Sequence, residues 1–168
     1  LLLLRKLLGM ELNVEKEAVG RGHQVLMPHG PAGDDEDRLI LGVIGSAWGD
    51  LGGPPRHRYV AFDKMSGRVR WVSTPGGQPA DLNTQSVPII AVVDGQRLII
   101  DGNADGHVYA LQARTGEKIW GFHLSKRGIN VSPVIEGTTV YISHSEENID
   151  QGTMGRVVAI DASGFRVP

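Results

Sequence analysis

The hexapeptide from Asp101 to Gly106 carries the residue types that most directly suggest chemistry in this chain. Its pattern Asp-x-Asn-x-Asp-Gly matches the first half of an EF-hand calcium loop, in which oxygens of Asp101, Asn103 and Asp105 would converge on a hard cation. The second half does not match, because the twelfth position is Gln112 instead of glutamate and both flanks have strand-like patterns. A hairpin turn rich in Asn, Asp and Gly is therefore the favoured interpretation, and calcium the weaker one.

The histidines and serines give no tight catalytic or metal-binding motif. No two histidines have the close spacing of a ligand pair such as His-x-x-x-His, so loop histidines are favoured over a site assembled from separate segments. Ser143 and His144 could be combined with several acids, but the chain has no Gly-x-Ser-x-Gly segment. We assign no catalytic residue. The six histidines are His23, His29, His57, His107, His123 and His144.

Composition narrows the function classes. The 168 residues suffice for one domain with a sizeable core. A formal net charge of −2 provides no broad basic field, so nucleic acid is not an expected partner. The absence of cysteine excludes disulfides, thiolate metal sites and a cysteine nucleophile.

The first 21 residues differ from the rest of the chain. Leu1, Leu4, Leu8 and Leu12 recur at helical spacing, which predicts an amphipathic helix over residues 2–18. The apolar run is too short for a membrane span, and we expect no transmembrane segment in this chain. Because the chain opens on leucine, we expect a fragment of a longer protein, and any export signal would lie upstream of these residues.

A three-fold internal repeat sets the architecture. The pattern aliphatic-x-Ala-aliphatic-Asp/Gln, followed by Ser/Thr-Gly, ends at Gly67, Gly116 and Gly164, with intervals of 49 and 48 residues. Trp71 and Trp120 each stand four residues beyond their glycine, whereas Pro168 stands where a third tryptophan is expected. The chain therefore repeats one structural unit about three times.

The middle unit predicts what each repeat contains. Short β-rich runs over residues 87–93, 97–100, 107–112 and 117–124 are separated by turns, which indicates four antiparallel strands joined by hairpins. A four-stranded sheet that repeats every 40 to 50 residues is typical of a β-propeller blade. We predict an all-β fold, a propeller fragment of about three blades over residues 22–168 (22–85, 86–130 and an incomplete 131–168), preceded by the short helix.

The segments 61–71 and 110–120 carry a recognisable motif, Ala-x-Asp-x-x-Thr-Gly-x-x-x-Trp, with Gln112 in place of the usual Asp. This motif resembles the tryptophan-docking repeat of the pyrroloquinoline-quinone (PQQ)-like β-propellers, a family that includes quinoprotein alcohol dehydrogenases and a non-catalytic outer-membrane-assembly lipoprotein. The resemblance covers roughly residues 38–164. It implies a propeller fold and a periplasmic or cell-envelope location, with further blades in the full-length protein.

Simple packing arguments explain the repeated positions. Alternation places Val108 and Ala110 on one sheet face and Tyr109 and Leu111 on the other, and both faces are apolar because blades pack face to face. The glycine provides a tight turn in the left-handed region, and the tryptophan fills a gap between blades. We therefore assign structural roles to Gly67, Trp71, Gly116, Trp120 and Gly164.

The candidate binding surface comes from the segments that depart from the repeat. The loop between the second and third strands is long in the first unit, Ser46 to His57, and in the third, His144 to Gly155. Equivalent loops of a propeller emerge on one face, together with the links between blades. The predicted face comprises Trp48, Asp50, Arg56, His57, Asn83, Gln85, Lys126, Arg127, Asn130, His144, Glu146, Glu147, Asn148 and Asp150.

Two functions are consistent with these observations. The favoured one is a non-catalytic binding or scaffold module of the cell envelope, which takes a protein or small-molecule ligand on the long-loop face and needs no cofactor. The alternative, implied by the resemblance, is part of a PQQ-dependent quinoprotein alcohol dehydrogenase with PQQ and calcium on the ring axis. The chain lacks the vicinal cysteines and the Trp-Gly-x-His-x-Trp segment associated with those enzymes, but other blades could hold them.

Overall fold

The computed structural model describes residues 23–25, 38–44, 57–77, 85–150 and 152–165. The helix predicted over residues 2–18 lies outside these ranges, as do Trp48, Asp50, Arg56 and Asn83 of the predicted binding face. Within them the chain forms strands and turns, which confirms the all-β prediction. The same part of the chain holds no helix long and apolar enough to cross a membrane.

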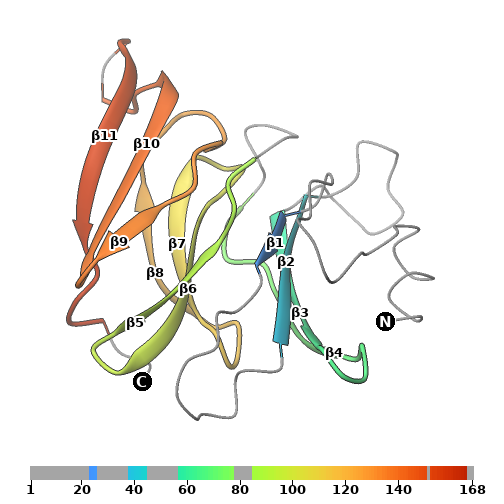
Figure 1. Ribbon diagram of the computed structural model, residues 1–168. Helices are drawn as coiled ribbons and strands as arrows, with labels where there is room; N and C mark the ends of the chain where they lie inside the picture. The colour runs from blue at the N-terminus through green and yellow to red at the C-terminus, as the bar shows by residue number, and fades with distance from the viewer. Residues whose placement is uncertain (1–22, 26–37, 45–56, 78–84, 151, 166–168) are drawn as a thin grey trace.

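Three antiparallel sheets follow one another along the chain (Figure 1). Each sheet is a simple meander in which consecutive strands pair, as expected for hairpin-connected blades. The first sheet contains β1 (His23–Val25), β2 (Arg38–Ile44), β3 (His57–Asp63) and β4 (Val69–Ser73). The second contains β5 (Ile89–Val93), β6 (Gln96–Gly102), β7 (His107–Gln112) and β8 (Lys118–His123). The third contains β9 (Val134–Glu136), β10 (Thr139–Glu147) and β11 (Met154–Asp161).

The second sheet follows the sequence prediction closely. Its four strands coincide with the four predicted runs, apart from shifts at the ends. The main difference concerns Asp101 and Gly102, which were expected in the turn but continue β6, where they pair with Tyr109 and Val108 of β7. Both residues are buried. Pairing across to β7 therefore extends the strand into a segment whose polar composition is typical of a loop.

The repeated Asp/Gln and Ser/Thr-Gly positions build the turn that ends each repeat. Gly67, Gly116 and Gly164 have φ angles of 69°, 76° and 80°, which confirms the predicted left-handed glycine. The Oδ1 atom of Asp63 accepts hydrogen bonds from the backbone N–H groups of Met65 and Ser66, at 3.1 and 2.7 Å. Gln112 Oε1 accepts the same pair of bonds from Arg114 and Thr115, at 2.6 and 2.9 Å. Glutamine can thus replace the usual aspartate because its amide oxygen reaches the same N–H groups.

Each face of the second sheet contributes to a different hydrophobic core. Val108 and Ala110 pack with Val140 and Ile142 of β10 in one cluster. Tyr109 and Leu111 pack with Tyr59 and Ala61 of β3 in the other. The predicted alternation is confirmed, and it explains why both faces of the strand are apolar: the second sheet lies between two neighbours.

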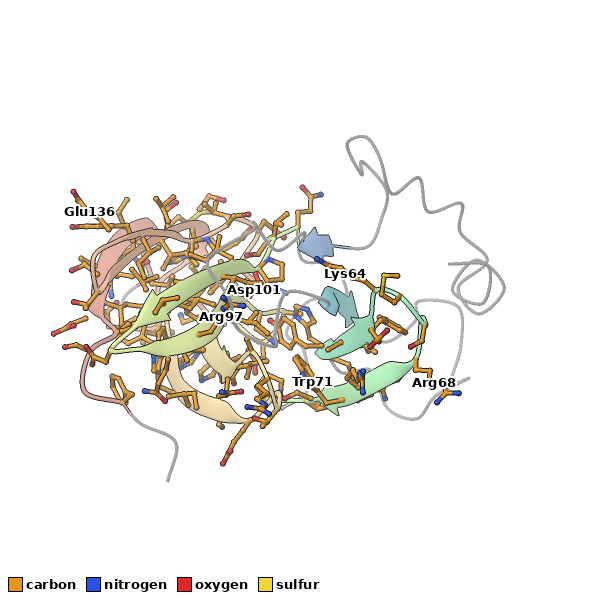
Figure 2. The ribbon with its side chains drawn as sticks, turned by 60° about the horizontal axis from the view of Figure 1, so that its bottom comes forward. Lys64, Arg68, Trp71, Arg97, Asp101 and Glu136 are labelled. Carbon is orange, nitrogen blue, oxygen red and sulfur yellow. The ribbon has the colours of Figure 1, made fainter. Side chains whose placement is uncertain are left out.

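The two repeat tryptophans differ in their surroundings. Trp71 is half-buried, and its indole Nε1 donates a hydrogen bond to the carbonyl oxygen of Ala113, at 3.2 Å (Figure 2). Trp120 is 6% exposed and packs in the core between the second and third sheets. Both side chains therefore lie where one sheet meets the next.

Candidate functional site

The predicted loop of residues 46–57 lies outside the described residues apart from His57, but other segments expected on this face meet at one end of the sheets. The turn Asn103–Gly106 joins β6 to β7, and the link that follows β8 lies against it. The backbone N–H groups of Leu124 and Ser125 both donate to the Gly106 carbonyl oxygen, at 3.0 Å, and Ile129 N donates to Asn103 O, at 3.1 Å. The second sheet therefore anchors its own outgoing link to its β6–β7 turn.

The link that follows β8 also forms hydrogen bonds with the third sheet. Ser125 forms an isolated antiparallel bridge with Asn148, and Lys126 N donates to the carbonyl oxygen of Glu147, at 3.1 Å. The Lys126 ammonium lies 3.7 Å from the Glu147 carboxylate, and Arg156 forms an ion pair with Asp150, at 2.7 Å. A strip of mixed charge thus crosses the boundary between the second and third sheets.

A third set of contacts joins the segment before β5 (residues 85–88) to the link between β8 and β9 (residues 124–133). Asn130 Oδ1 accepts a hydrogen bond from Gln85 N, at 3.0 Å, and Ser132 Oγ accepts one from Val87 N, at 2.8 Å. Each pair of partners is 45 residues apart in the chain and occupies equivalent places in consecutive repeats. Side chains of one link therefore satisfy backbone N–H groups of the previous link, which fixes the spacing of this end of the sheets.

The predicted face residues divide into an exposed group and a buried group. Gln85, Lys126, Arg127, Asn130, Glu147 and Asp150 are exposed, and Glu146 is half-buried. By contrast His57, His144 and Asn148 are buried. The expectation that His144 begins a loop is wrong, because β10 continues to Glu147, and His57 begins β3 instead of ending a loop.

The buried position of His144 affects its charge. Burial is the main cause that lowers the pKa of the His144 imidazole, and the nearby Arg156 guanidinium lowers it further. The ring is therefore neutral at pH 7 and presents no cation to a ligand.

A buried polar network joins the first and second sheets below this end. Asp101, which is 1% exposed, accepts hydrogen bonds from Ser86 Oγ at 2.5 Å and from Tyr59 OH at 3.0 Å. Ser86 Oγ in turn accepts one from Gly102 N, at 3.1 Å. Burial raises the pKa of Asp101 to about 7, although the bonds from Ser86 and Tyr59 act in the opposite direction. Burial therefore favours the protonated form of this carboxyl group much more than water does.

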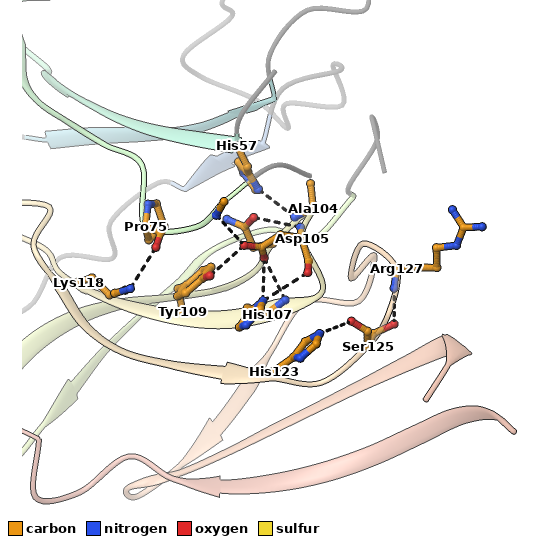
Figure 3. A network of polar contacts seen from close by, with 12 residues as sticks. His57, Pro75, Ala104, Asp105, His107, Tyr109, Lys118, His123, Ser125 and Arg127 are labelled. Atoms are coloured by element: carbon orange, nitrogen blue, oxygen red, sulfur yellow. Dashed lines mark hydrogen bonds and ion pairs between the residues drawn. The ribbon is translucent and has the colours of Figure 1, made fainter. Parts of the chain in front are cut away.

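Asp105 organises a second network at the turn itself (Figure 3). Its carboxylate accepts hydrogen bonds from Tyr109 OH at 2.9 Å, from His107 N at 3.1 Å and from Gly77 N at 3.3 Å. The His107 ring stacks on His123, with centroids 4.3 Å apart, and His123 Nε2 lies 3.0 Å from the carbonyl oxygen of Ser125. Burial, followed by the charge of Asp105, raises the pKa of Tyr109, so its hydroxyl group acts as a hydrogen-bond donor.

The two networks occupy the oxygens of Asp101 and Asp105, which the partial calcium-loop motif of residues 101–106 would offer to a metal ion. The Asp101 and Asp105 carboxylates serve different neighbours, and Asn103 Oδ1 accepts a hydrogen bond from Asp105 N, at 3.3 Å. Across the described ranges, no three His, Cys, Asp or Glu residues are placed to hold a metal ion. The hairpin-turn interpretation agrees with the observed contacts.

Sequence reasoning did not find the Tyr59–Asp101–Ser86 network. One available signal was the register of the repeat, since Tyr59 stands where the second unit has Val108. A hydroxyl group at a buried, otherwise aliphatic position requires a hydrogen-bond partner. Nothing in the spacing, however, identifies Asp101 or Ser86 as that partner.

Comparison with known proteins gives the family. A family model of PQQ-like repeats, described as outer membrane protein assembly factor BamB, matches residues 52–166, which is more than half of the chain. The chain belongs to this family. No curated protein matches it, but the PQQ-like fold recurs among solved structures.

Three solved structures are similar to this PQQ-like chain, and the first of them supports the propeller fold. BamB from Moraxella catarrhalis has a TM-score of 0.51 and 19% identity over 75% of this chain. A europium-containing methanol dehydrogenase has a TM-score of 0.47 and 19% identity over 75% of the chain. The quinohemoprotein alcohol dehydrogenase of Comamonas testosteroni has a TM-score of 0.43 and 16% identity over 77% of the chain. The chain spans 31%, 22% and 24% of the lengths of these three structures.

Proposed function

We propose that this chain is part of a non-catalytic PQQ-like propeller that binds a protein partner of the cell envelope. The observation that carries the proposal is the contact of Ser125 and Lys126 with Glu147 and Asn148, which joins loops of two sheets into one surface. Membership of a family described as an outer membrane protein assembly factor supports a periplasmic location and a protein ligand. The repeat tryptophans, in this proposal, dock one blade onto the next.

The chemistry of the surface suits a polar protein partner. Lys126 and Arg127 are exposed beside Glu147 and Asp150, so cationic and anionic groups alternate over a short distance. Backbone hydrogen bonds hold the segments that carry them, which reduces the entropy lost on binding. Such a surface favours a partner with complementary charges, and its binding should weaken as salt increases.

Site-specific photo-crosslinking in the full-length protein tests this proposal. A photoreactive residue at Lys126 or Glu147 should give a discrete crosslinked envelope protein, whereas one at Arg114, in a hairpin turn, or at Glu136, the last residue of β9, should not. The double charge reversal Lys126→Glu and Arg127→Glu should abolish the crosslink at Glu147, and Arg114→Glu should leave it unchanged. Crosslinking that is equal at all four positions would contradict the proposal.

The enzymatic alternative has its own measurement. PQQ and Ca²⁺ are added to the full-length protein, and quinone absorbance and dye-linked alcohol oxidation are followed. We expect neither uptake nor turnover. Alcohol oxidation that depends on both additions would replace the binding function with a quinoprotein dehydrogenase.

A further inference from the structure

Two histidines face each other across neighbouring strands of the second sheet. His107 on β7 and His123 on β8 form a directly opposed antiparallel pair. Opposed residues in such a pair have Cβ atoms about 4.5–5.5 Å apart, so their side chains meet on one face of the sheet. The two imidazole rings are nearly parallel, at 7°, and their centroids are 4.3 Å apart (Figure 3). Strand pairing therefore brings together two rings that the sequence keeps well separated.

The His107 ring is held through one of its two nitrogens. Its Nδ1 atom lies 3.3 Å from the carbonyl oxygen of Asp105 and 3.3 Å from the carboxylate oxygen Oδ1 of the same residue. Both oxygens can only accept a hydrogen bond, so the proton of the neutral ring is on Nδ1. The lone pair is consequently on Nε2, which has no hydrogen-bond partner among the described residues.

The His123 ring is held in the same way, but through its other nitrogen. Nε2 lies 3.0 Å from the carbonyl oxygen of Ser125, which again can only accept a hydrogen bond. The proton of the neutral ring is therefore on Nε2 and the lone pair on Nδ1. Within the part of the chain that the structure describes, His123 Nδ1 also has no hydrogen-bond partner.

The two hydrogen-bonded nitrogens face the same end of the sheet. Asp105 belongs to the β6–β7 turn, and Ser125 lies against that turn because its N–H group donates to the Gly106 carbonyl oxygen, at 3.0 Å. Both protonated nitrogens are therefore directed toward the turn (Figure 3). The two nitrogens that carry lone pairs lie on the other side of their rings, away from the turn, where one ion can reach both.

This hydrogen-bond pattern is the one that metal-bound histidines have. In metal sites, the ring nitrogen that does not bind the metal almost always donates its hydrogen to a carboxylate or a carbonyl oxygen, which orients the ring and raises its basicity. Asp105 provides both kinds of oxygen to His107, and Ser125 provides a carbonyl oxygen to His123. Ring stacking by itself explains the contact between the rings but does not require that both be held from the same side.

Access and geometry are compatible with an ion between the rings. The His107 side chain is 32% exposed, and His123 is exposed. A tetrahedral ion about 2.0–2.1 Å from each nitrogen places the two nitrogens about 3.4 Å apart. Rings with centroids 4.3 Å apart reach this separation by rotation about χ2, a torsion with a broad energy minimum in histidine.

We propose that His107 Nε2 and His123 Nδ1 bind one divalent transition-metal ion of the class that prefers imidazole, such as Zn²⁺ or Cu²⁺. Solvent occupies the remaining positions, because no third His, Cys, Asp or Glu of the described residues is placed to bind the same ion. Ca²⁺ is not a ligand of this site, since it takes oxygen donors. The bound ion links the end of β8 to the start of β7, and the proposal does not depend on the function proposed above.

Histidine protection in the full-length protein measures binding at each ring separately. Diethyl pyrocarbonate transfers an ethoxycarbonyl group to an imidazole nitrogen that carries a lone pair, and a bound metal ion blocks that nitrogen. Trypsin cuts after Arg97, Arg114, Lys118 and Lys126, so His107 is the sole histidine of the fragment 98–114 and His123 that of the fragment 119–126. Mass spectrometry of these two fragments gives the two modification rates.

Zn²⁺ should slow the modification of both His107 and His123 at least about tenfold, because each loses its reactive lone pair to the same ion. The two residues should be protected over the same range of Zn²⁺ concentration. Ca²⁺ at the same concentrations should change neither rate.

Single variants test whether the two rings share one ion. His123→Gln should abolish the protection of His107, and His107→Gln should abolish that of His123, since one imidazole binds the ion at least about tenfold more weakly than two. The matched control is Phe122→Gln, which places the same new side chain on the other face of β8 and should leave both rings protected. Circular dichroism checks that the three variants fold like the parent.

Several results would overturn the proposal. Modification rates of the parent that do not change with Zn²⁺ would exclude the site without reference to any variant. Protection of one histidine alone, or protection of His107 that persists in His123→Gln, would show that the rings do not share an ion. Equal protection by Ca²⁺ would exclude a site of imidazole ligands.

Discussion

The indole ring of Trp71 lies so close to Gly116 of the next sheet that a Cβ atom at residue 116 would come within 2.5 Å of the ring. Gly116 also has a φ of 76°, in the left-handed region. Two independent constraints, backbone conformation and the approach of Trp71, thus require glycine at this one position. The repeated glycine is therefore part of the contact between sheets as well as part of a turn.

Gly116→Ala should lower the free energy of unfolding by about 2–4 kcal/mol, because left-handed strain and displacement of the Trp71 ring both contribute. Gly164→Ala is the matched control: its φ is 80°, but no atom lies within 4 Å of the added Cβ. It should cost only about 1–2 kcal/mol. Urea unfolding of both variants makes the comparison.

A double mutant separates the two contributions at Gly116. In a Trp71→Ala background the ring is absent, so Gly116→Ala should cost about as much as Gly164→Ala does. If Gly116→Ala costs the same with and without the ring, the contact with Trp71 contributes no energy.

Trp120→Ala should lower the free energy of unfolding by about 3–5 kcal/mol, because the ring fills the core between the second and third sheets and leaves a cavity when removed. Phe122→Ala, on the same strand but 40% exposed, should cost clearly less. Chemical denaturation followed by circular dichroism measures both. Equal costs would show that the core does not depend on the Trp120 ring.

Asp101 should make stability fall as the pH rises from about 4 to about 7. Its pKa is about 7 in the folded protein and 3.8 in the reference state. The folded state therefore binds the proton more tightly in this interval, and stability is lost as the carboxyl group ionises. The loss should approach about 4 kcal/mol, since each unit of pKa difference corresponds to about 1.4 kcal/mol.

Asp101→Asn provides the comparison for this pH effect. It does not ionise, and its Oδ1 can accept one of the two bonds from Ser86 and Tyr59, whereas its amide NH2 faces the other hydroxyl oxygen as a donor. The difference in unfolding free energy between parent and variant should therefore change with pH over the same interval, whatever other groups titrate. A difference that is constant between pH 4 and pH 7.5 would rule out titration of Asp101.

Gln112→Ala should cost about 1–2 kcal/mol, because the N–H groups of Arg114 and Thr115 lose their shared acceptor. Gln112→Asp should cost much less, since Asp63 makes the same bonds at the equivalent position of the first repeat. Thermal melts of the two variants give the test. If Gln112→Asp lowers stability as much as Gln112→Ala does, this turn requires the longer side chain of glutamine.

Much of the fold was predictable from the sequence because it depends on local rules. The interval between Gly67 and Gly116, the alternation around Ala110 and the left-handed glycines are set by turn chemistry and by the two-residue period of a strand. The repeat register also predicted that the loops after the second and fourth strands share one end of the sheets. These features need no knowledge of distant contacts.

The tertiary structure decided which polar residues are buried and what they contact. Asp101 looked like a turn residue, yet pairing with β7 and bonds to Ser86 and Tyr59 place it in the interior. His144 looked like a loop residue, yet β10 extends past it. In both cases the controlling partner lies on another strand, and a sequence reports composition along the chain but not the burial that such distant partners create.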